Sequence, residues 1–158
     1  MIFQGGGNTN IAKFNMDSAG TATDFGDTPS NVSIPCALCN ATRLVQAGGD
    51  SDSNEINYWT VSSGGTGQDF GDTVTNGYGR GAVNTNTRGV FMGGYTNQVI
   101  NAMDYITIAS TGNSIDFGNL TYGKYRGAGS INSTTRGVHS AGYLQGFTNT
   151  NIIDYITI

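Results

Sequence analysis

The sequence predicts an all-β protein, on the strength of three observations. Strand-like runs recur in the same order along the 158 residues, separated by turns rich in glycine, asparagine and serine. Hydrophobic residues make up 37% of the chain and are largely β-branched or aromatic, the types that favour pleated, half-buried strands. Glycine is frequent, with 25 residues, whereas the two prolines are too few for a proline-rich linker or a collagen-like chain.

One block of sequence returns along the chain and defines repeat units. Each copy has an apolar run closed by small residues, then a strand centred on an aromatic residue, then an Asp-Phe-Gly triplet in all but the last. The triplets begin at Asp24, Asp69 and Asp116, which are 45 and 47 residues apart. A period of this length, made of short strands, indicates a repeat architecture. We expect one repeat domain over 1–158, with units at about 1–43, 44–88 and 89–136 and a partial unit at 137–158.

The clearest copy starts at Arg88 and predicts its first two strands directly. Gly89 to Met92 is a short apolar run closed by Gly93-Gly94, so we expect a buried inner strand that ends in a tight turn. A polar loop from Tyr95 to Gln98 is expected next. Val99 to Ile108 then alternates and is expected to form the longest strand of the unit.

Two shorter strands are expected to complete the unit after a Ser-Thr-Gly-Asn turn. Ile115 to Gly118 is predicted as an outer strand with one aromatic anchor, and its aspartate is expected to bond local backbone N–H groups. Tyr125 to Ile131 is predicted as the fourth strand, before a polar turn that leads to Arg136. Four short antiparallel strands in 45–48 residues are typical of a β-propeller blade.

Repeated aromatic residues indicate how such units would be stabilised. A single four-stranded sheet is marginal in water, and stacking units face to face buries both of its faces. The tyrosines at 58, 105 and 155 and the phenylalanines at 25, 70 and 117 are therefore expected to pack between units. An arginine follows threonine at the start of three units, at Arg43, Arg88 and Arg136. We expect these arginines either to line a central channel or to bond backbone carbonyls of the next unit, and we expect structural bonding in preference to ligand binding.

The repeated phrase resembles kelch repeats. The wording Thr-Arg-Gly-Val-Phe-x-Gly-Gly, then Ile-Asp-Tyr-Ile-Thr-Ile, then Asp-Phe-Gly is similar to the kelch-like repeats of virion and tail proteins of tailed bacteriophages, notably marine ones. The resemblance covers essentially the whole chain, and its best copies run from Thr87 to Thr121 and from Thr135 to Ile158. It departs from cellular kelch units by having Phe where they carry Trp, Ala141-Gly142 for one Gly-Gly pair, and Phe14 for the first tyrosine.

This resemblance implies a non-enzymatic, extracellular virion protein, a structural or host-recognising component of a phage tail, fibre or neck. The array of about 3.5 units is an incomplete ring, because propellers close with about four to eight blades. We therefore expect other virion proteins, or copies of the same chain, to complete the ring, and the isolated chain not to be a well-behaved monomer. A host-surface glycan is a further expected partner.

Composition argues against several other classes of partner. The net charge is −4, and the seven basic residues form no run, so the electrostatic footprint of a nucleic-acid-binding protein is missing. The apolar runs are far shorter than the roughly 20 residues that span a bilayer, so membrane insertion is not expected.

Motifs that suggest catalysis or cofactors have simpler interpretations. The Asp-Phe-Gly triplet lacks the other parts of a kinase site, and Gly5-Gly6-Gly7 lacks the Lys and Ser/Thr of a phosphate loop. His139 is the single histidine, which leaves no triad or copper site visible. Cys36 and Cys39 supply two ligands where structural zinc usually needs four, so we expect buried or partly buried thiols. We expect no enzyme activity, catalytic residue, cofactor or metal, and a solvated loop at the acidic residues Asp50, Asp52 and Glu55.

Two irregular loops are the candidate sites for recognition, since a residue present in every unit is expected to serve the unit. The loops Tyr95 to Gln98 and Tyr143 to Asn149 combine aromatic rings with amides and hydroxyls, which suits sugars or protein surfaces. The alternative to a virion component is therefore a lectin-like carbohydrate-binding propeller module. The candidate ligand or partner residues are Tyr95, Asn97, Tyr143 and Phe147.

Overall fold

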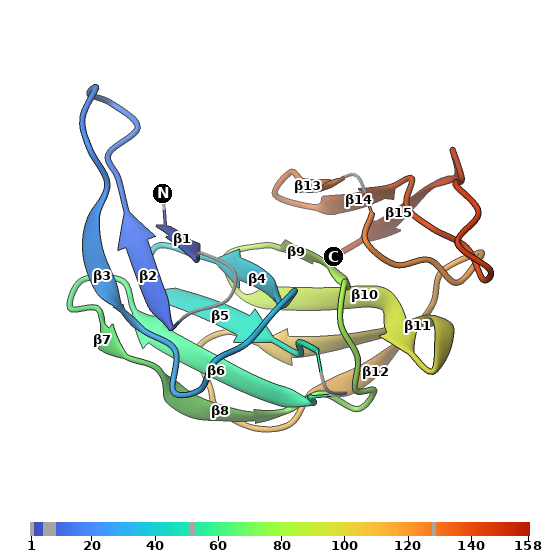
Figure 1. Cartoon of the computed structure of the whole chain (residues 1–158), viewed down its shortest axis with the longest axis horizontal. Coiled ribbons are helices and arrows are strands. Elements are labelled where there is room, and N and C mark those ends of the chain that lie inside the picture. Colours follow the sequence, from blue (N-terminus) through green and yellow to red (C-terminus); the bar gives the residue numbers. More distant parts are fainter. Residues whose placement is uncertain (1, 5–8, 51–52, 128) are drawn as a thin grey trace.

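The computed structural model describes residues 2–4, 9–50, 53–127 and 129–158, and these form fifteen strands and no helix (Figure 1). The all-β prediction is confirmed. Within these residues no helix is long and apolar enough to cross a membrane. Gly5-Gly6-Gly7, for which the sequence argued against a phosphate loop, and the acidic residue Asp52 lie outside the described residues.

The strands form four small sheets that follow one another along the chain. The first sheet lies at the left of Figure 1 and the fourth at the upper right. The first, in spatial order, contains β1 (Ile2–Gln4), β2 (Asn10–Lys13), β3 (Thr23–Asp27) and β7 (Gly65–Thr66). The second contains β4 (Cys36–Cys39), β5 (Arg43–Ala47), β6 (Glu55–Thr60) and β8 (Gln68–Asp72). The third contains β9 (Gly81–Asn84), β10 (Arg88–Thr96), β11 (Gln98–Thr107) and β12 (Ile115–Asn119). The fourth contains β13 (Gly129–Asn132), β14 (Arg136–Ser140) and β15 (Ile153–Thr157).

Pairing within the second, third and fourth sheets is antiparallel throughout, and each of these sheets begins with its edge strand β4, β9 or β13. These three edge strands converge, since β9 contacts both β4 and β13. Only β7, a two-residue strand, pairs in parallel, with β3 of the first sheet.

The strand predicted from Tyr125 to Ile131 was placed in the wrong sheet. The observed strand is shorter, Gly129–Asn132, and it pairs with β14 of the fourth sheet. The third sheet instead takes its fourth strand from Gly81–Asn84, ahead of Arg88. The apolar run from Gly89 is accordingly a central strand, flanked by β9 and β11. The hydrogen-bonded sheets are thus offset by one strand from the repeat units seen in the sequence.

The Asp-Phe-Gly triplets form the same bulge in three sheets. In the first sheet Asp24 and Gly26 pair with Ala12 and Ile11, so the phenylalanine between them is the extra residue. The second and third sheets repeat this register shift at their own triplets. The backbone N–H groups of Gly26 and Gly71 donate to the aspartates two residues earlier, both at 3.1 Å, which confirms the predicted role of the aspartate there. The three glycines have φ between 121° and 148°, a region that strains other residues.

The triplet glycines of the first and second sheets also lie in close backbone contact with a turn of the following unit. A Cβ on Gly26 would collide with the backbone of Gly65, and one on Gly71 would collide with the backbone of Gly112. Gly112 N–H donates to the Phe70 carbonyl at 2.6 Å. The turn after β6 is therefore packed against the triplet strand β3 of the first sheet, and the turn after β11 against the triplet strand β8 of the second.

The predicted turn at Gly93-Gly94 is a bulge inside a longer strand. Strand β10 continues to Thr96, and its pairing with β11 shifts register between Met92 and Gly94. The predicted polar loop from Tyr95 to Gln98 is consequently a tight hairpin whose turn residue is Asn97. Both glycines have positive φ, as do Gly48 and Gly49 and also Ala141 and Gly142. The left-handed backbone is thus kept in the fourth sheet even where alanine replaces glycine.

The core lies between the sheets and is built from equivalent residues. In the second, third and fourth sheets one face carries three cross-strand neighbours that end in a tyrosine, and we call it the tyrosine face. These trios are Leu38–Val45–Tyr58, Val83–Val90–Tyr105 and Ile131–Val138–Tyr155. The third sheet covers the first trio with Phe91 and Ile106, and the fourth covers the second with Ile156 and Ile158. Each large apolar side chain buried in this way contributes about 1.5–3 kcal/mol.

The first sheet joins the second through a separate cluster. Ile11 and Phe25 pack against Leu44 and Trp59, and the Trp59 indole N–H donates to the Asp27 carbonyl at 3.0 Å. The register also corrects the alignment of the first repeat. Lys13, and not Phe14, occupies the position of the later tyrosines, and its ammonium lies 5.8 Å from the centre of the Phe25 ring.

Candidate functional site

Three of the four predicted site residues gather around one buried tyrosine. Tyr125 is 2% exposed, and its ring centre lies 5.1 Å from that of Tyr95, 5.7 Å from Tyr143 and 6.1 Å from Phe147. Tyr78 adds a fifth ring, 5.5 Å from Tyr95. Burial raises the pKa of the Tyr125 phenol against the opposing effect of the Arg126 guanidinium, and the neighbouring phenols add to the increase. We call these five residues the aromatic cluster.

The aromatic cluster connects the third and fourth sheets. Tyr78 and Tyr95 form an isolated antiparallel bridge, and Tyr125 and Tyr143 form the equivalent one, 47 or 48 residues later. Sequence reasoning missed Tyr78 and Tyr125, although a Tyr followed closely by Arg-Gly in both places was a detectable signal. Most of the rings pack on one another, so the cluster is first of all an inter-sheet contact.

Of the four predicted residues, Phe147 and Asn97 are the exposed ones. Phe147 is 70% exposed and has a φ of 61°, within a segment that does form a loop, as predicted. Asn97 is the exposed turn residue of the hairpin between β10 and β11. The two segments are joined by a hydrogen bond from Val99 N–H to the Gln145 side-chain oxygen at 2.9 Å. The structure therefore places all four predicted residues in one region, with Phe147 as its projecting ring.

A cleft of about 400 Å³ lies where the three inner edge strands converge. It is lined by the segments that enter β4, β9 and β13, and by His139 of β14. A backbone ladder crosses it, because Gly79 N–H donates to the Ile34 carbonyl at 3.1 Å and Arg126 N–H donates to the Gly79 carbonyl at 2.7 Å. Ile34, Gly79 and Arg126 share a left-handed φ of 50° to 63°, so the three sheets enter this cleft through equivalent turns.

His139 is buried beside the cleft and hydrogen-bonded to a serine. Its Nδ1 lies 2.9 Å from the Ser130 hydroxyl, and its Nε2 has no hydrogen-bond partner among the described residues. Burial, and to a smaller extent the nearby Lys124 ammonium, lower the pKa of His139 to about 4 against the opposing effect of Asp154. The imidazole is therefore neutral near pH 7. Sequence reasoning missed this Ser–His pair because the two residues meet only through the pairing of β13 with β14.

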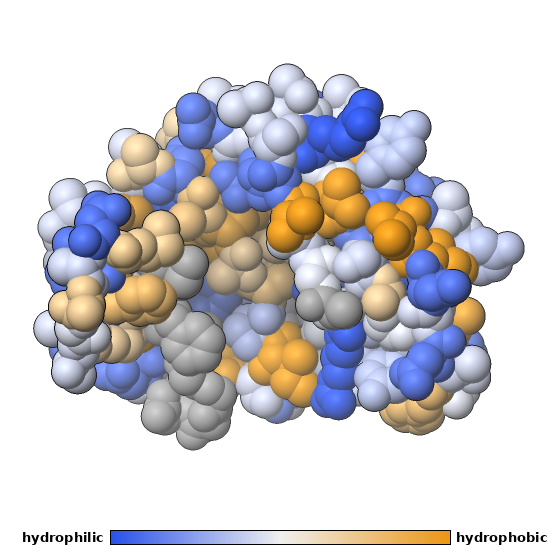
Figure 2. Space-filling model, turned by 90° about the horizontal axis from the view of Figure 1, so that it is seen from above, coloured by the Kyte–Doolittle hydropathy of each residue, from blue (hydrophilic) through white to orange (hydrophobic). Residues whose placement is uncertain are grey.

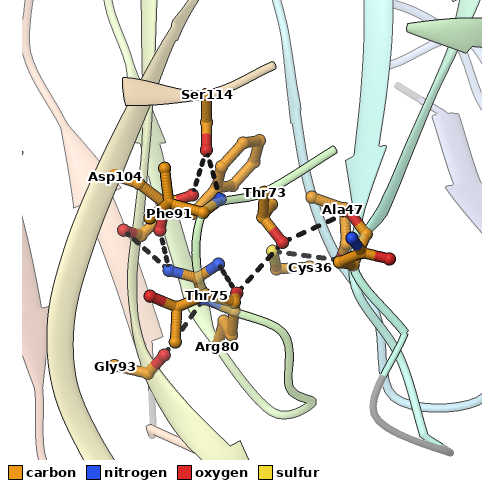
Figure 3. Close-up of polar contacts among 11 residues, drawn as sticks. Cys36, Ala47, Thr73, Thr75, Arg80, Phe91, Gly93, Asp104 and Ser114 are labelled. Atoms are coloured by element: carbon orange, nitrogen blue, oxygen red, sulfur yellow. Dashed lines mark hydrogen bonds and ion pairs between the residues drawn. The ribbon is translucent and has the colours of Figure 1, made fainter. Parts of the chain in front are cut away.

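Two buried ion pairs in the third and fourth sheets have equivalent aspartates, although their cations come from different positions of the repeat, Arg80 just after the left-handed turn residue and Lys124 two residues before it. Arg80 pairs with Asp104, which also accepts a hydrogen bond from the Ser114 hydroxyl at 2.6 Å (Figure 3). Lys124 pairs with Asp154, its Nζ lying 2.8 Å from the carboxylate. Burial raises the pKa of Asp154, but hydrogen bonds from Lys124 and Thr121 outweigh it and hold that pKa below its ordinary value.

The second sheet has Asn57 at the position of these aspartates. In that sheet the residue aligned with Arg80 is Pro35, ahead of Cys36. In these three sheets a buried carboxylate is thus found where a cation lies beside it, because burying an unpaired carboxylate is costly. The charge of each ion pair is used within the fold, which marks both pairs as structural.

The two cysteines differ in environment. Cys36 is buried near Arg80 and Asp104, and its thiol donates to the Ala47 carbonyl at 3.3 Å (Figure 3). Burial raises the pKa of Cys36 to about 11. Cys39, at the end of the same strand, is exposed, which contradicts the expectation that it is at least partly buried.

The repeated arginines stack on the repeated tyrosines. The guanidinium carbons of Arg43, Arg88 and Arg136 lie 4.4, 4.7 and 4.9 Å from the ring centres of the tyrosines at 58, 105 and 155. Arg43 also donates to the Ile108 carbonyl of the next unit at 2.8 Å, which confirms the prediction for this arginine. The stacking itself was not predicted.

The tyrosine face of the fourth sheet is exposed, unlike its two predecessors. Ile131 is 72% exposed, whereas the equivalent Leu38 and Val83 are buried. Tyr155 and Ile153 are also about two-thirds exposed, at 66% and 67%. The view from above shows hydrophobic surface over the part of the molecule formed by β13–β15 (Figure 2). An apolar face of this kind typically marks an interaction surface.

Comparison with known proteins identifies the fold alone. No protein-family model and no curated protein matches the sequence. Among solved structures, the chain is similar to one titled "Structure of YjhT", with a TM-score of 0.77 at 11% sequence identity. The match covers 96% of this chain and 49% of that one, so the chain spans about half the length of the protein it resembles in fold.

Proposed function

We propose that this chain is a run of kelch-like β-propeller blades that serves as a non-enzymatic building module and is completed by further blades. The observation that carries the proposal is the exposed tyrosine face of the fourth sheet. The same apolar trio is buried twice within the chain, each time by the sheet that follows it. The third trio has the same register and a similar composition, a branched aliphatic residue followed by valine and tyrosine, and so is suited to the same kind of cover.

Further features support repetition beyond these residues. Glycine in the second strand of a covering sheet makes room for the trio, since a Cβ on Gly89 would collide with Leu38 and one on Gly137 would collide with Val83. Ile131 occupies the position of Leu38 and Val83, so we expect a glycine-containing strand to pack against it in the same way.

The biological setting that we propose is the virion of a tailed bacteriophage, as part of a tail, fibre or neck appendage. This assignment rests on the resemblance of the repeated phrase to phage kelch-like repeats. A low content of charged residues, 11%, and neutral polar turns suit an extracellular scaffold. Its partners would be other virion proteins or copies of the chain, and its surface would be available for host recognition.

The proposal is tested by looking for the polypeptide in purified particles. Mass spectrometry of gradient-purified virions should find the peptides of this chain in stoichiometric amounts, and native mass spectrometry should give the mass of its undenatured assembly. Absence from particles would reject the virion assignment. Incorporation of Ile131→Asp into particles as efficiently as the wild type would reject completion by further blades on this face.

A second candidate is a lectin-like module, favoured by one observation. Phe147 projects into solvent beside Asn97 and Gln145, so an aromatic face stands next to amide groups, as in sugar-binding sites. Binding of the isolated protein to a glycan array, lost in Phe147→Ala and kept in Met16→Ala, would support it. Met16 is a fair control because it is 68% exposed on the hairpin of the first sheet.

A further inference from the structure

We propose that the open edge of β15 and the open flank of β12 are together the docking site for a single segment with a glycine turn followed by an Asp-Phe-Gly strand. This inference rests on the proposed function and deepens it, because it states which sequence the missing partner supplies at this edge. It follows from two separate positions, one on the fourth sheet and one on the third, that depart from the pattern of the earlier sheets.

The first position is the outer edge of the fourth sheet. In each of the other three sheets one strand, β2, β6 or β11, pairs with the strand that carries the triplet. We call this strand the third strand, after its place in the second and third sheets. Strand β15 is equivalent to those third strands, but among the described residues it pairs with β14 alone. Its other edge therefore presents unpaired backbone N–H and C=O groups, which folded proteins usually cover.

The tyrosine on this strand lacks the ring that its equivalents contact. Tyr58 packs edge-to-face with Phe70, with ring centres 5.9 Å apart, and Tyr105 packs in the same way with Phe117, at 6.0 Å. Tyr155 keeps the stacked arginine of its predecessors and is 66% exposed. The residue that would complete this contact is therefore a phenylalanine at the β-bulge of a neighbouring strand.

The second position is on the third sheet. The triplet glycines Gly26 and Gly71 are each in backbone contact with a turn from the next unit. A Cβ on Gly118, the third triplet glycine, would meet only the tip of Met103, at 4.0 Å, among the described residues. By the pattern of the two earlier units, a glycine-containing turn that leads into a triplet strand would cover Gly118.

One segment satisfies both positions. The two earlier copies run from the turn to the triplet as Ser-Ser-Gly-Gly-Thr-Gly-Gln-Asp-Phe-Gly and Ser-Thr-Gly-Asn-Ser-Ile-Asp-Phe-Gly. Transferred to the fourth sheet, the register of the third places the triplet aspartate opposite Asp154 and its glycine opposite Ile153. The facing aspartates are tolerated, as they are at Asp104 and Asp116, because Lys124 neutralises Asp154 as Arg80 neutralises Asp104.

The occupant is further repeat sequence and not a second copy of residues 1–158. The three triplet strands of the chain, β3, β8 and β12, are each already paired with a third strand of their own sheet. A second copy would have to break one of these pairings to supply the segment. A segment with an unpaired triplet has no such cost.

The experiment uses the full chain and a synthetic peptide with the sequence of residues 109–120, Ala-Ser-Thr-Gly-Asn-Ser-Ile-Asp-Phe-Gly-Asn-Leu. We expect saturable binding, with slowed hydrogen exchange at amides of 153–158 and of 116–119. A control peptide with alanine for its phenylalanine should bind about tenfold more weakly, since an aromatic pair is worth about 0.5–1.5 kcal/mol beyond its buried area. Tyr155→Ala should weaken binding similarly, and Met16→Ala should not.

Three outcomes would overturn the inference. Equal protection by both peptides would show that no phenylalanine position exists, and protection confined to other strands would place the segment elsewhere. Protection of β15 that rises with chain concentration in the absence of peptide would identify a second copy as the occupant. Each result is independent of whether the chain is found in virions, so a failure here is distinguishable from a failure of the proposed function.

Discussion

The third and fourth sheets begin alike and end differently. Both have an edge strand at the central cleft, a central strand that starts Arg-Gly-Val, and a third strand that carries Asp-Tyr-Ile. The third sheet has a fourth strand and neighbours on both of its faces, and its central residues Val90 and Phe91 are fully buried. The fourth sheet has three strands and one open face. Equivalent sequence is thus buried or exposed according to the neighbour, and local sequence alone does not decide which.

The largest expected effect is a difference in the free energy of unfolding between variants of two aspartates in the third sheet. Asp104→Ala leaves Arg80 buried without its counter-ion, so we expect a loss of about 3–5 kcal/mol in the free energy of unfolding. Asp116→Ala, directly across the strand pair and exposed, should change it by less than about 0.5 kcal/mol. Urea denaturation of the two variants measures both. Similar losses in the two would mean that the ion pair has no special role.

The next effect compares two isoleucines at the same position of the repeat. Ile56 is fully buried on the tyrosine face of the second sheet, and Ile153 is 67% exposed on that of the fourth. Ile56→Ala should cost about 2–5 kcal/mol, because it removes buried methyl groups and leaves a cavity. Ile153→Ala in the isolated chain should cost less than about 0.5 kcal/mol. A large cost at Ile153 at low protein concentration would show that this face is already covered within the monomer.

Sequence periodicity predicted the class of the fold and the role of the repeated aspartates, because these depend on neighbours within a few residues. Asp24 and Asp69 bond N–H groups two residues along the chain, as expected. Strand partners depend on contacts distant in sequence, so Gly129–Asn132 was assigned to the preceding sheet although it pairs with β14. The bulge at Gly93 was missed for a related reason, since glycine pairs suit both turns and bulges.

The candidate site was predictable in part. Irregular loops indicated Tyr95, Tyr143 and Phe147, and the structure brings these rings together around Tyr125. The central residue, Tyr125, was not recognised as part of the site because it begins the segment 125–131, which was interpreted as a strand. The exposure of the fourth tyrosine face was beyond sequence reasoning, since its residues have the same pattern as those of the buried faces.

A smaller effect concerns pH and compares His139 with Phe91, its equivalent in the third sheet. The folded-state pKa of His139 is about 4, below its ordinary value of 6.5, so protonation favours the unfolded state. Stability is therefore complete above pH 6.5 and falls toward pH 4, by at most about 1.4 kcal/mol per pH unit. His139→Phe should flatten the profile between pH 6.5 and pH 4. The loss through Asp154, whose pKa is also lowered, begins only near its ordinary value of 3.8.

The profile is measured as the urea midpoint of the wild type and of His139→Phe from pH 7.5 to pH 4. The groups around the imidazole are Ser130, Lys124 and Asp154, and Ser130→Ala serves as the control that removes the hydrogen bond and leaves the titration in place. A wild-type profile as flat as that of the variant would show that water reaches the ring and that its pKa is ordinary.

The smallest effect tests the loop that joins the two sheets. Phe147 is 70% exposed and contacts Tyr125 edge-to-face, so Phe147→Ala should cost no more than about 1.5 kcal/mol, the upper value of an aromatic pair. Tyr125→Ala removes the buried centre of the aromatic cluster and should cost about 3–5 kcal/mol, by analogy with buried Phe and Trp. If the two costs were equal, the loop would be part of the core. A negligible cost at Phe147 would show that its ring contributes little to stability and is available for contact with a partner.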